Sequence, residues 1–134
     1  MIKRIGIDLV EKKRIKKILD KFGDKFIEKI LTEAELKEYL SKKIYSRKIS
    51  FLSNNFASKE AAAKVIGTGF TQGVTLKDIE VLREKSGLPY LLMKGTALKK
   101  AKELGCRNFL LTISDTKDHS LAFVLGEGQW KLYF

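Results

Sequence analysis

The first part of the chain shows the apolar periodicity of one strand followed by helices. Residues 2–8 alternate between apolar and polar side chains, which predicts a strand. Residues 11–22 carry apolar side chains three or four positions apart, as an amphipathic helix does, and Gly23 is expected to end that helix. Apolar positions within 26–31 predict a second, shorter helix. The apolar stripe of the first helix consists of Ile15, Ile18, Leu19 and Phe22.

Two more helices are predicted before the period changes. Thr32 and Glu35 have the spacing of a capping box, in which two side chains satisfy free backbone N–H groups at a helix start. A longer helix is expected at 47–66, because Gly67 and Gly69 follow it and glycine commonly terminates helices.

The second half of the chain has the period of β-strands. A helix at 96–104 interrupts the strands, and a turn at 86–89 joins the first two of them. Helices gathered early and strands late predict an α+β fold, with a mostly antiparallel sheet packed against N-terminal and central helices. The length of 134 residues predicts a single domain, 1–134. The expected strands are 78–83, 90–94, 108–114 and 120–126, with a further edge strand at 130–134.

Composition is that of an ordinary globular protein, with 44% hydrophobic and 32% charged residues. No apolar run approaches the roughly 18 residues of a membrane span, and the first residues lead into a strand rather than a secretory signal. The single cysteine, Cys106, cannot form an internal disulfide and is interpreted as a small buried apolar residue in a reducing compartment. We therefore expect a cytoplasmic protein without a membrane partner.

The net charge of +11 predicts attraction to an acidic partner. Residues 1–50 carry fifteen Lys and Arg against eight Asp and Glu, whereas residues 51–134 carry twelve against eight. The basic surface is therefore expected mainly on the N-terminal helices. A nucleic-acid-binding module is one alternative, but no helix-turn-helix, aromatic RNP-like or zinc pattern occurs, so we expect no nucleic-acid partner.

The most informative stretch is 56–64, which reads Phe-Ala-Ser-Lys-Glu-Ala-Ala-Ala-Lys. It places Glu60 and Lys64 one turn apart on the same face of an alanine-rich helix. The turn at 67–69 follows, where glycines let the backbone approach an anion closely. A second carboxylate, Asp8, lies at the end of the first predicted strand. Two carboxylates, a lysine and a glycine turn are suited to holding a divalent metal against a diphosphate.

These residues resemble the motifs of the holo-acyl-carrier-protein synthases, the short 4′-phosphopantetheinyl transferases. The segment Gly6-Ile-Asp-Leu-Val-Glu11, followed by Arg14, is similar to the first motif of that family. The stretch 56–64, followed by Gly-Thr-Gly at 67–69, is similar to the second and more specific motif. The spacing between the motifs and the total length also fit, and the resemblance covers nearly the whole chain.

The resemblance implies transfer of the 4′-phosphopantetheine arm of coenzyme A to a serine of apo-acyl-carrier protein, for fatty acid biosynthesis. Adenosine 3′,5′-bisphosphate leaves as the serine hydroxyl attacks the β-phosphorus, so the protein's tasks are positioning and charge stabilisation. The implied cofactor is Mg²⁺, bound by Asp8 and Glu60, with Lys64 contacting the same phosphates. Either a metal-bound water or Glu60 could take the serine proton.

The resemblance also extends to the nucleotide and to assembly. It implies that Gly67, Thr68 and Gly69 bring the backbone close to the nucleotide and that Lys59 contacts the 3′-phosphate. Short members of the family assemble as homotrimers with their sites at subunit interfaces, so a homotrimer is expected here from the resemblance alone.

Several of these residues have a structural alternative. Asp8 could cap the helix that follows, since aspartate is a preferred N-cap residue. Glu60 and Lys64 could form an ordinary exposed pair worth about 0.3–0.5 kcal/mol. Phe56 is interpreted as a core residue rather than a base-stacking platform, and His119 as a surface residue near the last hairpin.

Asp115 departs from the pattern of the family, in which many members carry histidine at this position. It is therefore a weaker site candidate. Together with Asp8 and Glu60 it leaves open a metal-dependent phosphohydrolase or nuclease, although such sites usually collect more acids and histidines.

A basic stripe is predicted beside the apolar stripe of the first helix. Arg14, Lys17, Lys21 and Lys25 follow one another at spacings of three, four and four. A solvated surface is the simple interpretation. The family docks its strongly acidic carrier proteins on this helix, however, so the resemblance favours recognition of the acyl-carrier protein.

Overall fold

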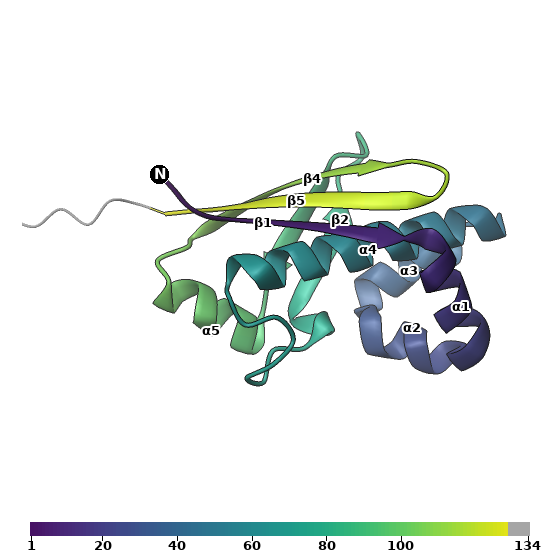
Figure 1. Ribbon diagram of the computed structural model, residues 1–134, viewed down its shortest axis with the longest axis horizontal. Coiled ribbons are helices and arrows are strands. Elements are labelled where there is room, and N and C mark those ends of the chain that lie inside the picture. Colours follow the sequence, from purple (N-terminus) through teal and green to yellow (C-terminus); the bar gives the residue numbers. More distant parts are fainter. Residues whose placement is uncertain (129–134) are drawn as a thin grey trace, which may run out of the picture.

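The computed structural model describes residues 1–128, so the edge strand expected at 130–134 lies outside the described residues. Its fold is α+β, with two antiparallel sheets rather than one (Figure 1). The strands are β1 (Ile2–Glu11), β2 (Ile79–Arg83), β3 (Pro89–Met93), β4 (Asn108–Asp115) and β5 (His119–Glu127). The helices are α1 (Lys12–Phe22), α2 (Asp24–Ile30), α3 (Glu33–Ser41), α4 (Tyr45–Val65) and α5 (Gly95–Glu103), with a 3₁₀ turn, η1 (Leu76–Asp78).

Helix α4 organises the molecule. It runs along one face of the three-stranded sheet, whose strand order is β1-β5-β4 (Figure 1). Helices α1, α2 and α3 gather at one end of α4, and α5 lies toward the other end with the β2–β3 sheet nearby. No helix among residues 1–128 is long and apolar enough to cross a membrane.

The approach of β1 to α4 depends on glycine at position 6. A Cβ built on Gly6 would lie 2.1 Å from the carbonyl oxygen of Ala61, so any larger residue would push the strand off the helix. The helix contributes small side chains to the same contact, since Ala57, Ala61 and Ala62 are fully buried. The two motifs of the sequence therefore meet face to face, which brings Asp8 against α4 because side chains alternate along a strand.

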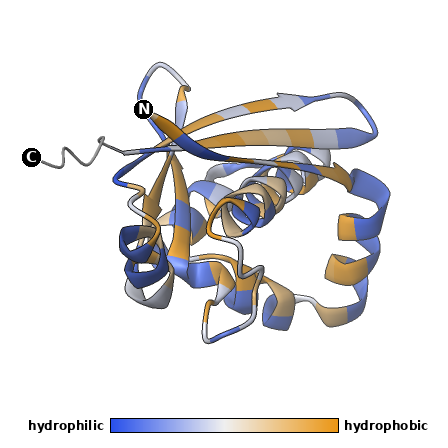
Figure 2. Ribbon diagram, turned by 60° about the vertical axis from the view of Figure 1, so that its left-hand side comes forward, coloured by the Kyte–Doolittle hydropathy of each residue, from blue (hydrophilic) through white to orange (hydrophobic). Residues whose placement is uncertain are grey.

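The opposite face of the three-stranded sheet is apolar and exposed. Ile5, Ile7 and Leu9 are 61%, 52% and 63% exposed. They lie opposite the β5 side chains Leu125, Phe123 and Leu121, respectively. Figure 2 shows hydrophobic positions recurring along these strands. Monomeric proteins rarely expose a continuous apolar surface of this kind. These six residues are called the open sheet face.

Most predicted elements are present, with shifted ends. The capping box at Thr32 and Glu35 is formed, with the Glu35 N–H donating to Thr32 Oγ1 and the Thr32 N–H donating to Glu35 Oε1. The N-cap of α1 is Glu11 and Asp8 lies within β1, so the capping alternative for Asp8 is wrong. Lys25 lies on α2 rather than on the first helix, because Gly23, at φ +53°, breaks the chain direction between them.

Candidate active site

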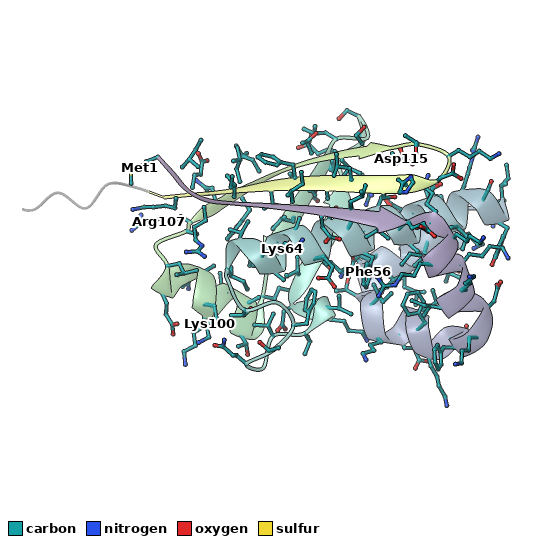
Figure 3. The ribbon with its side chains drawn as sticks, viewed as in Figure 1. Met1, Phe56, Lys64, Lys100, Arg107 and Asp115 are labelled. Atoms are coloured by element: carbon teal, nitrogen blue, oxygen red, sulfur yellow. The ribbon has the colours of Figure 1, made fainter. Side chains whose placement is uncertain are left out.

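Asp8 and Lys64 are in direct contact across the β1–α4 interface. The Lys64 Nζ donates to Asp8 Oδ1 at 3.0 Å and to the carbonyl oxygen of Ile7 at 2.8 Å. The Asp8 side chain is only 16% exposed, whereas that of Lys64 is 54% exposed. In Figure 3 the labelled Lys64 projects from α4 just below β1. Lys64 thus pairs with a carboxylate far away in sequence, rather than with Glu60 as the ordinary helix pair requires.

Glu60 completes this cluster one turn before Lys64. Its pKa is raised, first by burial and then by the negative charge of Asp8, while the charges of Lys64 and Arg14 act in the opposite direction. The two carboxylates therefore repel each other across the β1–α4 contact. A bound cation would relieve this repulsion, so the electrostatics of the cluster suit a positive ligand.

The donor set fits a magnesium ion better than most other metals. Within residues 1–128 no group of three or more His, Cys, Asp or Glu side chains could hold a metal by itself. Mg²⁺ typically takes one or two carboxylates and completes its shell with phosphate oxygens and water. Asp8 and Glu60 are two carboxylates of this kind, and Glu60 lines an open groove.

The groove beside Glu60 has a volume of about 620 Å³. One side of it is α4, which contributes Phe56 and Glu60, and the opposite side is the segment 70–77. Phe56 is partly buried and packs against the core, which agrees with its interpretation as a core residue. The sequence alone does not indicate segment 70–77 as part of the site, because this segment has neither strand nor helix periodicity.

Comparison with known proteins decides what kind of enzyme this geometry belongs to. A family model described as the 4′-phosphopantetheinyl transferase superfamily matches residues 4–124. The chain belongs to this superfamily. Its match spans both motifs, from β1 to β5, and confirms the predicted family.

Named relatives of this transferase are similar over nearly their full length. The holo-[acyl-carrier-protein] synthase of Buchnera aphidicola (strain APS) is 45% identical over 123 residues, which are 92% of this chain and 95% of the relative. That of Vibrio cholerae (strain M66-2) is 39% identical over 127 residues, 95% of this chain and 98% of the relative.

Solved structures agree with the fold of this transferase. The synthase of Neisseria meningitidis superposes with a TM-score of 0.83 at 38% identity, covering 95% of this chain and 99% of that one. The synthase of Bacillus anthracis, solved in complex with CoA (3′,5′-ADP), gives a TM-score of 0.80 at 37% identity, covering 96% of this chain and 99% of that one. The predicted α+β fold is confirmed.

The glycine turn of the transferase motif has a structural role in this chain. Gly67 and Gly69 adopt φ values of +76° and +57°, which favour glycine. The Gly67 N–H donates to Lys64 O at 3.1 Å and the Gly69 N–H to Ala63 O at 3.3 Å, so both close the end of α4. Thr68 Oγ1 donates to the carbonyl oxygen of Gly69. An approach of this turn to the nucleotide stays a prediction.

Lys59 is not available to a 3′-phosphate, so that expectation is corrected. Its side chain has no exposed surface and its Nζ lies 2.8 Å from Glu35 Oε1. Burial lowers the pKa of Lys59, while the charge of Glu35 and the hydrogen bond that Lys59 donates to it act in the opposite direction. The side chain points into the core because it is one position from Glu60, about 100° around α4.

Asp115 does not join Asp8 and Glu60 within the chain. It lies on β4, and β5 separates β4 from β1. Its Oδ2 accepts a 2.8 Å hydrogen bond from Lys12 Nζ, which holds the β4–β5 turn against α1. The three-acid phosphohydrolase alternative therefore lacks its third acid. His119 is exposed at the start of β5, as expected.

Cys106 is 2% exposed and sits in the hydrophobic core, as its interpretation as a small apolar residue required. Burial raises the pKa of its thiol, which keeps it protonated and unreactive near neutral pH.

Proposed function

We propose that this chain transfers the 4′-phosphopantetheine arm of coenzyme A to a serine of apo-acyl-carrier protein, in fatty acid biosynthesis. The observation that carries the proposal is the meeting of Asp8, Glu60 and Lys64 at the β1–α4 contact, in a chain of the 4′-phosphopantetheinyl transferase superfamily. The names of its relatives, and the coenzyme A complex of one of them, support the two substrates.

The chemistry follows from the charges around this cluster. Asp8 and Glu60 would hold Mg²⁺. The bound ion would neutralise the negative charge that builds on the diphosphate and on the leaving group. Lys64 places a half-exposed ammonium beside Asp8, where it would contact the phosphate oxygens of the substrate. Its part is to orient the diphosphate and to stabilise the departing adenosine 3′,5′-bisphosphate.

Mass spectrometry tests the proposed transfer directly. Apo-acyl-carrier protein incubated with coenzyme A, Mg²⁺ and this chain should gain the mass of the phosphopantetheine arm. Loss of phosphate from coenzyme A without modification of the carrier would instead indicate a phosphohydrolase and contradict the proposal.

Replacing Lys64 by alanine should lower turnover about tenfold or more, since one charge contact to phosphate corresponds to roughly 1.4 kcal/mol. The melting temperature should barely move, because the Lys64 ammonium is 54% exposed and the attraction of a charge screened by solvent contributes little to stability. Steady-state kinetics and thermal denaturation measure the two effects.

Lys100→Ala is the matched control for Lys64. Lys100 forms a surface pair with Glu103 on α5, away from the groove, and should leave turnover unchanged. A Lys64→Ala chain with normal turnover but a lowered melting temperature would assign Lys64 a purely structural role.

We further propose that the acyl-carrier protein docks on α1 and α2. Arg14, Lys17, Lys21 and Lys25 are all exposed. An apolar groove of about 330 Å³ lies between the two helices and α4, lined by Ile18, Lys25, Phe26, Phe56 and others. A positive rim around an apolar centre suits an acidic, amphipathic helix.

Reversing Lys17 and Lys21 to glutamate should raise the KM for the carrier protein and flatten its dependence on salt, because rim charges act mainly on association rate. The KM for coenzyme A should stay nearly constant. Arg14 is left unchanged in this test, since its charge acts on Glu60 and would affect both substrates.

Lys99→Glu with Lys102→Glu is the control for this reversal, with the same change of charge on exposed positions of α5. An equal rise in the carrier KM for this control would show that net charge, not the α1 surface, attracts the carrier.

We also propose that the chain assembles as a homotrimer through the open sheet face, with sites at the subunit interfaces. Exposed cross-strand pairs of large apolar residues support an association of this kind.

A further inference from the structure

A fully buried ion pair lies behind the groove of the active site. Lys59 Nζ donates to Glu35 Oε1 at 2.8 Å, to the carbonyl oxygen of Leu76 at 2.9 Å and to that of Ile79 at 2.7 Å. Neither Lys59 nor Glu35 has any exposed side-chain surface. An ammonium group has three protons, so the donors of Lys59 are fully used.

Glu35 is equally engaged. Its carboxylate accepts the N–H of Thr32 at 2.9 Å, the side-chain amide of Asn55 at 2.9 Å and the N–H of Val81 at 3.3 Å. Because Glu35 lies on α3 and its partners Asn55 and Val81 lie on α4 and β2, the ion pair ties three elements together. A buried charge that is paired and hydrogen-bonded in this way costs far less than an isolated one.

The two carbonyl groups that accept from Lys59 belong to Leu76, the first residue of the 3₁₀ turn η1, and to Ile79, the residue after the turn. This turn ends the segment 70–77, which forms the wall of the groove opposite Glu60. Before η1, residues 66–75 belong to no helix or strand, so regular secondary structure does not fix the position of the wall. Lys59 and Glu60 are neighbours on α4: one side chain holds the wall from behind, and the other faces the groove.

We propose that Lys59 and Glu35 are a positioning pair, which fixes segment 70–77 relative to Glu60 and so preforms the groove for coenzyme A. The inference rests on the proposed function for the identity of the ligand. Neither residue touches the reacting atoms. Their effect should therefore fall on the binding of coenzyme A more than on the chemical step.

Two variants test this role. Lys59→Met removes the three donated bonds but leaves Glu35 as a buried unpaired charge, which endangers folding. The double variant Glu35→Gln with Lys59→Met is neutral and keeps an acceptor for Asn55 and Val81. In the double variant we expect the KM and the Kd for coenzyme A to rise about tenfold or more, with a much smaller change in kcat.

Hydrogen exchange gives a readout independent of activity. The Val74 N–H donates to Thr71 O at 3.0 Å and the Asp78 N–H donates to Thr75 O at 3.1 Å. Both amides should exchange faster in the double variant, because the segment that holds them is no longer fastened to α4.

Lys12→Met is the matched control. Lys12 Nζ is also held by a hydroxyl, a carboxylate and a carbonyl, those of Ser50, Asp115 and Thr116 at 3.0, 2.8 and 2.6 Å. These partners join α1, α4 and the β4–β5 turn, apart from the groove. This variant should lower the melting temperature while the Kd for coenzyme A stays unchanged.

The outcomes separate this inference from the proposed function. A double variant with the wild-type Kd for coenzyme A and unchanged exchange at Val74 and Asp78 would overturn the positioning role, as would an equal loss of affinity in Lys12→Met. Absence of transfer by the wild-type chain would overturn the proposed function instead. Calorimetry with coenzyme A measures the affinity without any transfer.

Discussion

Asp8→Ala and Glu60→Ala should each lower the rate of transfer by about a hundredfold or more, because several kcal/mol of charge stabilisation at the diphosphate is lost. The double variant should be little worse than either single one, since two residues that hold one ion act as a unit. Calorimetric titration with Mg²⁺ should show weakened binding in all three variants.

Glu103→Ala is a suitable control, because this carboxylate lies on α5 and pairs only with Lys100 among the ion pairs described. Its rate and Mg²⁺ affinity should match those of the wild type. If the losses of the two single variants instead multiply in the double variant, Asp8 and Glu60 act independently and the shared ion is ruled out.

Most helices and strands could be predicted from the sequence, because the interactions that form them join residues only a few positions apart. The capping box at Thr32 formed as expected, since its donors and acceptors are three residues apart. Glycine at position 6 and the alanines of α4 carry the β1–α4 contact, so the two motifs that were recognised in the sequence are the two surfaces that meet. The pairing of Asp8 with Lys64 follows from that contact.

The direction of Lys59 was not predictable from its motif. Adjacent residues on a helix differ by about 100° in direction, and the alanine-rich helix gives little indication of which face is buried. The residue that decides the matter, Glu35, is 24 positions away and belongs to another helix. The position of Lys59 beside Glu60 in the motif therefore suggests a contact with the 3′-phosphate, although its side chain is buried in the core.

The place of Asp115 depended on strand order, which short-range patterns do not determine. Had β4 paired with β1, Asp115 would have come near Asp8. Because β5 lies between them, its carboxylate is left to Lys12. In the same way, the spacing of the basic residues predicts one continuous stripe, but the positive φ of Gly23 turns the chain and places Lys25 on α2.

Replacing Ile7 by glutamate should dissociate the proposed homotrimer into single chains. Ile7 is 52% exposed at the centre of the open sheet face and lies opposite Phe123. Burying an isoleucine side chain is worth about 1.5–3 kcal/mol, and a glutamate in its place would be an unpaired charge in an apolar interface. Because the sites are proposed to lie at subunit interfaces, transfer should fall together with the mass measured by light scattering.

Leu40→Glu is the control for this change. Leu40 is 57% exposed on α3, so it tests the same substitution at an exposed apolar residue outside the open sheet face. That variant should keep both the assembly and the rate of the wild type. The folded state of Ile7→Glu, checked by circular dichroism, should also be unchanged, since the side chain points away from α4. A fully active single chain would show that the site is complete without a second copy, and a trimer that survives Ile7→Glu would place the interface elsewhere.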